Sequence, residues 1–267
     1  MTHLWYVARS FYPDYDGKRT ENLIITCFCG PLAPGDDRRG RAITREENMK
    51  HFASKSFDAA FGLGLAALPA AAADTSCNTT FSNGTINGNL VVPNGAACTL
   101  INETVTGNVT VGTGAALTVN KGGTTGGNIR ASHCSVVMLN NSLGAVSVGG
   151  NVAIEFCTNP SGYGGPGASP ITISGNFTCA NSDSCVARGG SVGGNIQVNG
   201  NAGSAGGVAV ASNTVMGNVL VNNNGKTSSV GGNNIGGNLS CQGNAGISDE
   251  THPNTVAGHK LGQCAGL

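Results

Sequence analysis

The sequence predicts an all-β fold: a single-stranded right-handed parallel β-helix, or solenoid, of about nine coils. Three observations predict it. A Gly-Asn pair recurs about every twenty residues, apolar residues alternate with period two beside each pair, and helix formers are scarce between the glycines. A repeat this short cannot bury its own apolar face, so successive repeats must stack. The right hand follows from the general rule for parallel crossovers.

The asparagines of the pairs define the coils. They are Asn89, Asn108, Asn128, Asn151, Asn176, Asn195, Asn218 and Asn238, with His259 in place of a ninth. In Leu90-Val91-Val92 and its counterparts, apolar residues flank one residue that is polar in most copies, which is typical of a strand with one buried face. Asparagines stacked at one coil position are expected to bond to each other as a structural ladder. Glycine is expected to supply the positive φ of the turns.

A second rank of small polar residues stands four positions before each asparagine. Its members are Thr85, Thr104, Thr124, Ser147, Thr172, Ser191, Thr214, Asn234 and Thr255. No second threonine rank accompanies it two residues further on. We therefore expect a solvated ladder of hydroxyls on one sheet face. The alternative is a surface that binds ice or another crystalline lattice.

Charge divides the chain into parts. Residues 1–48 hold seven Lys/Arg and seven Asp/Glu, whereas residues 74–267 hold five and six and carry 37 of the 43 glycines. Two compositions this different rarely share one cooperative domain. We interpret residues 1–48 as a disordered upstream extension assigned in error, with Met49 as the true start. The alternative is a real N-terminal extension.

Residues 49–73 have the layout of a secretory signal peptide. A basic start precedes an apolar run over 59–68, and Ala71-Ala72-Ala73 forms a cleavage site that leaves Asp74 first. The run is shorter than the roughly 20 residues that span a bilayer. We therefore expect a β-helix domain over 74–267 with irregular caps. It should be secreted to the periplasm, the medium or the cell surface, with no membrane span after signal removal.

The exported region contains eight cysteines, which are Cys77, Cys98, Cys134, Cys157, Cys179, Cys185, Cys241 and Cys264. An even number in an exported chain favours disulfides, although eight cysteines allow 105 pairings. Three sequential gaps are close to one repeat, which would place the partners on neighbouring coils. The sequence thus favours four sequential bridges, the fourth joining Cys179 to Cys185 in a tight local loop. Zinc sites usually contain cysteine pairs that lie closer together in the sequence than these do, which favours disulfides over zinc.

The repeat is interrupted between Asn151 and Asn176, where residues 157–170 are rich in glycine and proline and should bulge as a loop. Its Tyr163 is the one tyrosine of the exported region, which has no tryptophan. If a local site exists, we expect it at Tyr163 together with Arg130 and Glu155. An exposed ion pair between Arg130 and Glu155 is the plainer alternative.

Composition argues against several function classes. A net charge of zero without a basic stripe argues against nucleic acid. The histidines show no metal-ligand spacing, so we predict no metal and no cofactor. Gly189-Gly190-Ser191-Val192-Gly193 matches a hydrolase motif, but that motif needs a helix after the serine. No catalytic residue is predicted.

Two segments of the chain resemble known proteins. Residues 104–119 (TVTGNVTVGTGAALTV) and the ending 236–267 resemble secreted bacterial β-helix proteins with Gly-Asn coil repeats, which are pectin-lyase-like or adhesin-like solenoids and largely uncharacterised. A looser similarity in coil period links the chain to bactofilin-type polymer-forming proteins. The resemblance implies an exported non-catalytic structural, surface or adhesive protein. The alternative is a pectin-lyase-like polysaccharide-active enzyme or carbohydrate-binding module. The implied partners are surface or extracellular polysaccharide, or further copies of the chain.

Overall fold

The computed structural model describes residues 7–13, 19–25, 73–140, 142–164, 169–204 and 206–267. The chain divides into two compact units, residues 1–64 and 65–267. In the first unit, β1 (Val7–Pro13) and β2 (Arg19–Ile25) pair as an antiparallel hairpin. Residues 26–72 lie outside the described residues, so the proposed start at Met49 and the signal peptide over 49–73 stay predictions.

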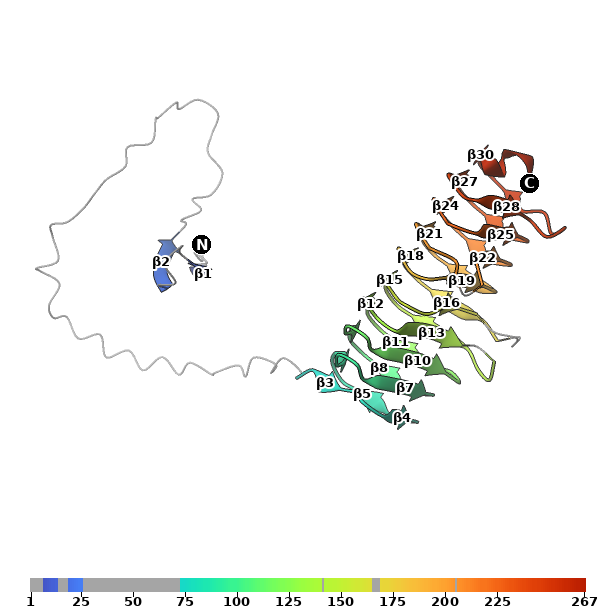
Figure 1. The fold of residues 1–267 in the computed structure, drawn as a ribbon. Helices are drawn as coiled ribbons and strands as arrows, with labels where there is room; N and C mark the ends of the chain where they lie inside the picture. The colour runs from blue at the N-terminus through green and yellow to red at the C-terminus, as the bar shows by residue number, and fades with distance from the viewer. Residues whose placement is uncertain (1–6, 14–18, 26–72, 141, 165–168, 205) are drawn as a thin grey trace, which may run out of the picture. The chain divides into compact units, whose positions relative to one another are not determined.

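The second unit is a parallel β-solenoid of about nine turns, as the Gly-Asn repeat predicts. Its strands follow one another around three faces and stack coil upon coil from β3 to β30 (Figure 1). The one helical element in the described part of the chain is a short 3-10 turn, η1 (Gln263–Gly266), at the last coil. The right hand of the coil stays a prediction.

Each face is one parallel sheet. Sheet 1 consists of β3 (Thr75–Ser76), β6 (Leu90–Val92), β9 (Val109–Val111), β12 (Ile129–Ser132), β15 (Val152–Glu155), β18 (Phe177–Ala180), β21 (Ile196–Asn199), β24 (Val219–Asn222), β27 (Leu239–Gln242) and β30 (Lys260–Gly262). Sheet 2 consists of β4 (Thr80–Ser82), β7 (Ala97–Ile101), β10 (Ala116–Asn120), β13 (Val136–Asn140), β16 (Ser161–Tyr163), β19 (Cys185–Arg188), β22 (Val208–Ala211), β25 (Thr227–Gly231) and β28 (Gly246–Ser248). Sheet 3 consists of β5 (Thr85–Ile86), β8 (Thr104–Val105), β11 (Thr124–Thr125), β14 (Val146–Val148), β17 (Ile171–Ile173), β20 (Gly190–Val192), β23 (Thr214–Val215), β26 (Asn234–Ile235) and β29 (Thr255–Val256).

The core is a column of aliphatic side chains inside the three sheets. In β6, Leu90 and Val92 are fully buried and Val91 points outward, and β9 repeats the pattern with Val109 and Val111. Each such side chain contributes roughly 1.5–3 kcal/mol on burial. On sheet 3 the predicted hydroxyl rank is in register, since Thr104 pairs with both Thr85 and Thr124.

Three of the predicted disulfides join successive coils: Cys77 to Cys98, Cys134 to Cys157, and Cys241 to Cys264. The predicted fourth bridge is wrong, because Cys179 and Cys185 are free, buried thiols. They do not close a tight local loop. They lie on β18 of sheet 1 and β19 of sheet 2, and both side chains are fully buried in the core.

The Gly-Asn pairs form the predicted ladder at the corner between sheets 3 and 1. Asn108 donates its backbone N–H to Asn89 Oδ1 at 2.9 Å and its Nδ2 to the same oxygen at 3.2 Å. Equivalent double rungs continue through Asn218. Asp74 begins the ladder by accepting from Asn89 Nδ2, and the backbone N–H of His259 ends it by donating to Asn238 Oδ1.

The glycine of each pair is needed because a side chain there would collide with the preceding coil. This corrects the prediction that the glycine supplies a positive φ. Of the glycines before the ladder asparagines, Gly88 alone has a positive φ. A Cβ on Gly107 would come within 2.6 Å of both Asn89 Oδ1 and the Gly88 carbonyl oxygen, and Gly127 repeats this contact with Asn108 Oδ1 at 2.6 Å. The ladder side chain of one coil therefore occupies the space that a side chain on the next coil would need.

The first half of the segment 157–170, residues 157–164, does not form the bulging loop that its composition predicts. Cys157 is tied to the preceding coil by its disulfide, and β16 adds to sheet 2 between β13 and β19. Residues 165–168 lie outside the described residues. Among the residues that the structure describes, no helix is long and apolar enough to cross a membrane.

Candidate binding groove

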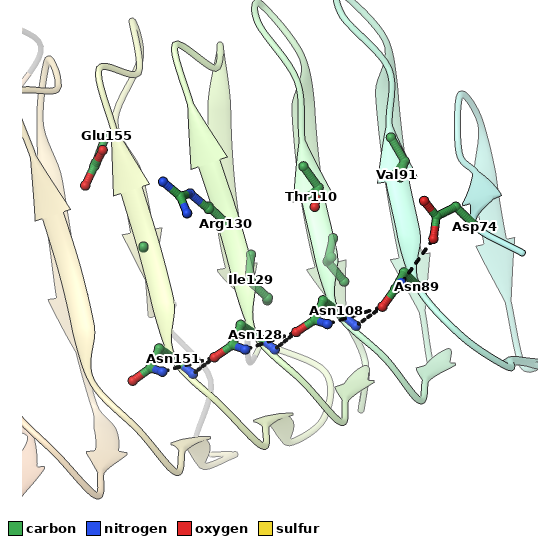
Figure 2. A pocket seen from close by; sticks show the side chains of 12 residues that line it. Asp74, Asn89, Val91, Asn108, Thr110, Asn128, Ile129, Arg130, Asn151 and Glu155 are labelled. Carbon is green, nitrogen blue, oxygen red and sulfur yellow. Dashed lines mark hydrogen bonds between the residues drawn. The ribbon is translucent and has the colours of Figure 1, made fainter. Parts of the chain in front are cut away.

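An open groove of about 540 Å³ runs across the outer face of sheet 1, over its N-terminal coils. The asparagine ladder follows one side, and outward side chains of β6, β9, β12 and β15 form the floor (Figure 2). The lining residues are Asp74, Asn89, Val91, Asn108, Val109, Thr110, Asn128, Ile129, Arg130, Asn151, Ala153 and Glu155. The groove thus crosses five coils of one continuous sheet.

Two of the three predicted site residues lie in this groove. Arg130 on β12 and Glu155 on β15 stand on neighbouring strands and point outward above the ladder (Figure 2). The register pairs Arg130 with Ala153 and Ser132 with Glu155, so the two charges are offset along the strands. Within the described part of the chain neither charge forms an ion pair or a hydrogen bond, and the predicted surface pair is absent.

The third predicted residue, Tyr163, does not belong to this surface. Its side chain is fully buried in β16, with its ring edge-on to Phe177 at 4.8 Å between centroids. The hydroxyl donates to Asn213 Oδ1 at 3.0 Å. Burial raises the pKa of Tyr163 well above its ordinary value, and the charge of Cys185 raises it further. The tyrosine is a core residue, because its ring fills the interior and its one polar atom is satisfied there.

An aromatic pair, one member of which follows the lining residue Glu155 in the chain, was not predicted. His133 and Phe156 follow β12 and β15 directly, and their rings stack with centroids 4.9 Å apart and planes 14° apart. Ser132 Oγ lies 3.0 Å from His133 Nδ1, and Phe156 is 45% exposed. We call Ser132, His133 and Phe156 the aromatic corner. The Cys134–Cys157 disulfide follows it immediately in the chain.

Both rings stand on left-handed backbone. His133 has φ 55° and Phe156 has φ 56°. The equivalent positions on later coils are Asn181, Gly200, Asn223 and Gly243, which are the residue types that tolerate this conformation. A bulky residue there costs about 1–3 kcal/mol, and such strain gathers at functional sites. The sequence signal was therefore a histidine and a phenylalanine at a position otherwise held by Asn or Gly.

Two further asparagine ladders were also missed, and both are buried. At the corner between sheets 2 and 3, Asn213, Asn233 and Asn254 bond in series. At the corner between sheets 1 and 2, Asn201, Asn224, Asn244 and Gln263 do the same. The signal of the first ladder is an asparagine five residues before Asn218, Asn238 and His259, which occurs only in the last three copies. The signal of the second is an asparagine six residues after Asn195, Asn218 and Asn238.

The chemistry available in the groove is polar binding. In the described part of the chain no group of three or more His, Cys, Asp or Glu residues could hold a metal ion. The two carboxylates of the lining, Asp74 and Glu155, lie beside β3 and β15, four strand spacings or about 19 Å apart. Paired-carboxylate hydrolysis of a glycosidic bond needs a separation of roughly 5–9.5 Å.

Comparison with known proteins adds no identification. No family model matches the chain, and neither a curated protein nor a solved structure matches it.

Proposed function

We propose that this chain is an exported, disulfide-stapled rod with a non-catalytic structural or adhesive role at or beyond the cell surface. The observation that carries the proposal is the placement of the three disulfides. Each joins two successive coils, one near the first coil, one in the middle and one at the last. Bridges of this kind persist in oxidising compartments and are rare where thiols are kept reduced.

The ladders support the same role. One asparagine ladder runs the length of the solenoid and two more brace its C-terminal coils. Because each rung links neighbouring coils, a local opening of the C-terminal coils must break bonds on three corners at once. A rod built this way is suited to bearing a binding surface outside the cell.

Fractionation of an expressing culture tests the proposal. We expect the chain in the medium, the periplasm or the surface fraction, with six of its eight C-terminal cysteines resistant to alkylation before reduction. A cytoplasmic product with all of these cysteines reduced would contradict it. Concentration-dependent light scattering would test the further prediction of self-assembly.

A polysaccharide-active enzyme is the second candidate, and the groove is the observation that favours it. The wide separation of Asp74 and Glu155 argues against paired-carboxylate hydrolysis and supports binding without cleavage. A screen for depolymerisation of plant and bacterial polysaccharides separates the two candidates. Cleavage that Glu155→Gln abolishes would overturn the non-catalytic role.

A further inference from the structure

We propose that the groove and the aromatic corner together bind one neutral glycan chain that lies along the rod. The inference rests on the adhesive role proposed above and names its ligand class. It draws on three features: a row of unpartnered amide donors, an unpaired guanidinium and carboxylate, and the strained aromatic pair.

The ladder presents hydrogen-bond donors at a fixed spacing. The amide nitrogens of Asn108, Asn128 and Asn151 each donate one hydrogen to the preceding asparagine. A primary amide carries two such hydrogens, so the second hydrogen of each has no protein partner in the described part of the chain. The coils repeat about every 4.8 Å, and the groove therefore offers a straight row of donors to an extended chain rich in oxygen acceptors.

The charges of the groove favour a neutral ligand. Its lining holds the carboxylates of Asp74 and Glu155 and the single guanidinium of Arg130. A polyanion would meet more negative than positive charge there, which opposes binding. Hydroxyl groups satisfy both signs, because they donate to the free Glu155 carboxylate and accept from the free Arg130 guanidinium. A polyhydroxylated chain without charge fits this combination.

The strand pairing argues against a peptide ligand. An extended peptide usually binds a sheet through the unpaired backbone of an edge strand. Strands β6, β9, β12 and β15 are each paired on both sides, so the floor of the groove has no free edge. The face offers side chains only, and these suit a chain that presents hydroxyls.

The aromatic corner supplies the apolar contact that sugar binding usually needs. Phe156 keeps nearly half of its surface exposed beside Glu155, and the stacked His133 fixes its ring. Carbon-bound hydrogens of a sugar ring pack against aromatic carbon. Both residues keep a left-handed backbone where the next four coils have Asn or Gly at the same corner position, and a ligand contact accounts for that choice.

Calorimetric titration of the purified full chain with cello-oligosaccharides, chito-oligosaccharides and polygalacturonate tests the proposal. We expect at least one neutral oligosaccharide to bind more tightly than polygalacturonate. Arg130→Ala and Phe156→Asn should each weaken that binding about tenfold or more. The control is Gln197→Ala, which changes an exposed residue of sheet 1 outside the groove and should leave binding unchanged.

Phe156→Asn separates a binding role from a structural one. Asparagine is the residue found at this position on two later coils, so the variant should keep or raise the melting temperature while it loses affinity. Three results would overturn the proposal: no neutral oligosaccharide bound at millimolar concentration, tighter binding of polygalacturonate, or binding unchanged by both variants. An exported, oxidised rod that binds no glycan would refute this inference and leave the proposed surface role standing.

Discussion

The exposed and buried asparagine ladders use the same hydrogen bonds in different surroundings. In the exposed ladder, Asn128 bonds to Asn108 and Asn151 beside solvent. In the buried ladder, Asn233 accepts two hydrogens from Asn213 and donates to Asn254 Oδ1 and to the Val210 carbonyl. Water can replace the bonds of the first but not those of the second. The exposed ladder, which follows the conspicuous Gly-Asn repeat, therefore defines the shape of the solenoid. The buried ladder, which is harder to see in the sequence, contributes more to the free energy of unfolding.

The largest expected effect is that of Asn233→Ala. The substitution removes four hydrogen bonds and leaves their partners buried, so it should lower the free energy of unfolding by about 3–5 kcal/mol. Denaturant unfolding followed by circular dichroism measures it. A loss below about 1 kcal/mol would mean that burial does not distinguish the two ladders.

Gly127→Ala should cause the next largest loss of stability. The new methyl group would lie 2.6 Å from Asn108 Oδ1 and 2.8 Å from the Gly107 carbonyl oxygen, and overpacking of this kind costs about 2 kcal/mol. Gly95→Ala is the control for alanine in a turn, because a Cβ there meets nothing within 4 Å, although its left-handed φ adds a strain of its own. If Gly127→Ala unfolds no more easily than wild type, the close approach of the coils is not the reason for the glycine.

Alkaline pH should lower the free energy of unfolding, through groups at the end of the buried ladder where the Tyr163 hydroxyl donates to Asn213. Burial raises the pKa of Tyr163 above its ordinary 10.0, and burial together with Cys179 raises the pKa of Cys185 above 9.0. The folded state then keeps protons that the unfolded chain loses. This stability is present below about pH 9 and falls as pH rises, by about 1.4 kcal/mol per pH unit for each group.

Unfolding at a series of pH values from neutral to about 11 measures this slope. Tyr163→Phe removes the tyrosine contribution and should make the slope shallower above pH 10. An identical slope in wild type and in Tyr163→Phe would show that the phenol does not stay protonated in the fold.

The smallest expected effect is that of Asn128→Ala. It deletes the three side-chain hydrogen bonds of one rung of the exposed ladder, where water satisfies the groups that are left, so the loss should be about 1 kcal/mol. The same unfolding experiment measures it. A loss equal to that of Asn233→Ala would erase the distinction between the two ladders.

Sequence periodicity predicted the structural features that recur from coil to coil. The Gly-Asn pair recurs from Asn89 to Asn238, so the strand after it, the ladder and the coil-to-coil disulfides could be inferred from spacing alone. Asn233 belongs to a series of only three members, which is too short to stand out among so many asparagines. Tyr163 was placed on the surface because its neighbours are glycine and proline, yet its ring found a partner fifty residues away in Asn213. Asn213 lies two coils further along the solenoid, so its contact with Tyr163 could not be read from the local sequence.

The candidate site was predicted less well than the fold. Arg130 and Glu155 stood out as rare charges in a neutral repeat, and the structure brings them to one groove. His133 and Phe156 could have been found only by aligning the corner positions, since their significance is the left-handed backbone that Asn and Gly adopt on the other coils. Side-chain type alone does not report backbone strain.

Non-reducing peptide mass spectrometry of the exported protein tests the central claim most directly. We predict a first residue near Asp74 and three bridges, Cys77 to Cys98, Cys134 to Cys157 and Cys241 to Cys264, with Cys179 and Cys185 alkylated only after unfolding. A chain that keeps residues 1–73, or one whose eight C-terminal cysteines are all reduced, would contradict the account of an exported, stapled rod.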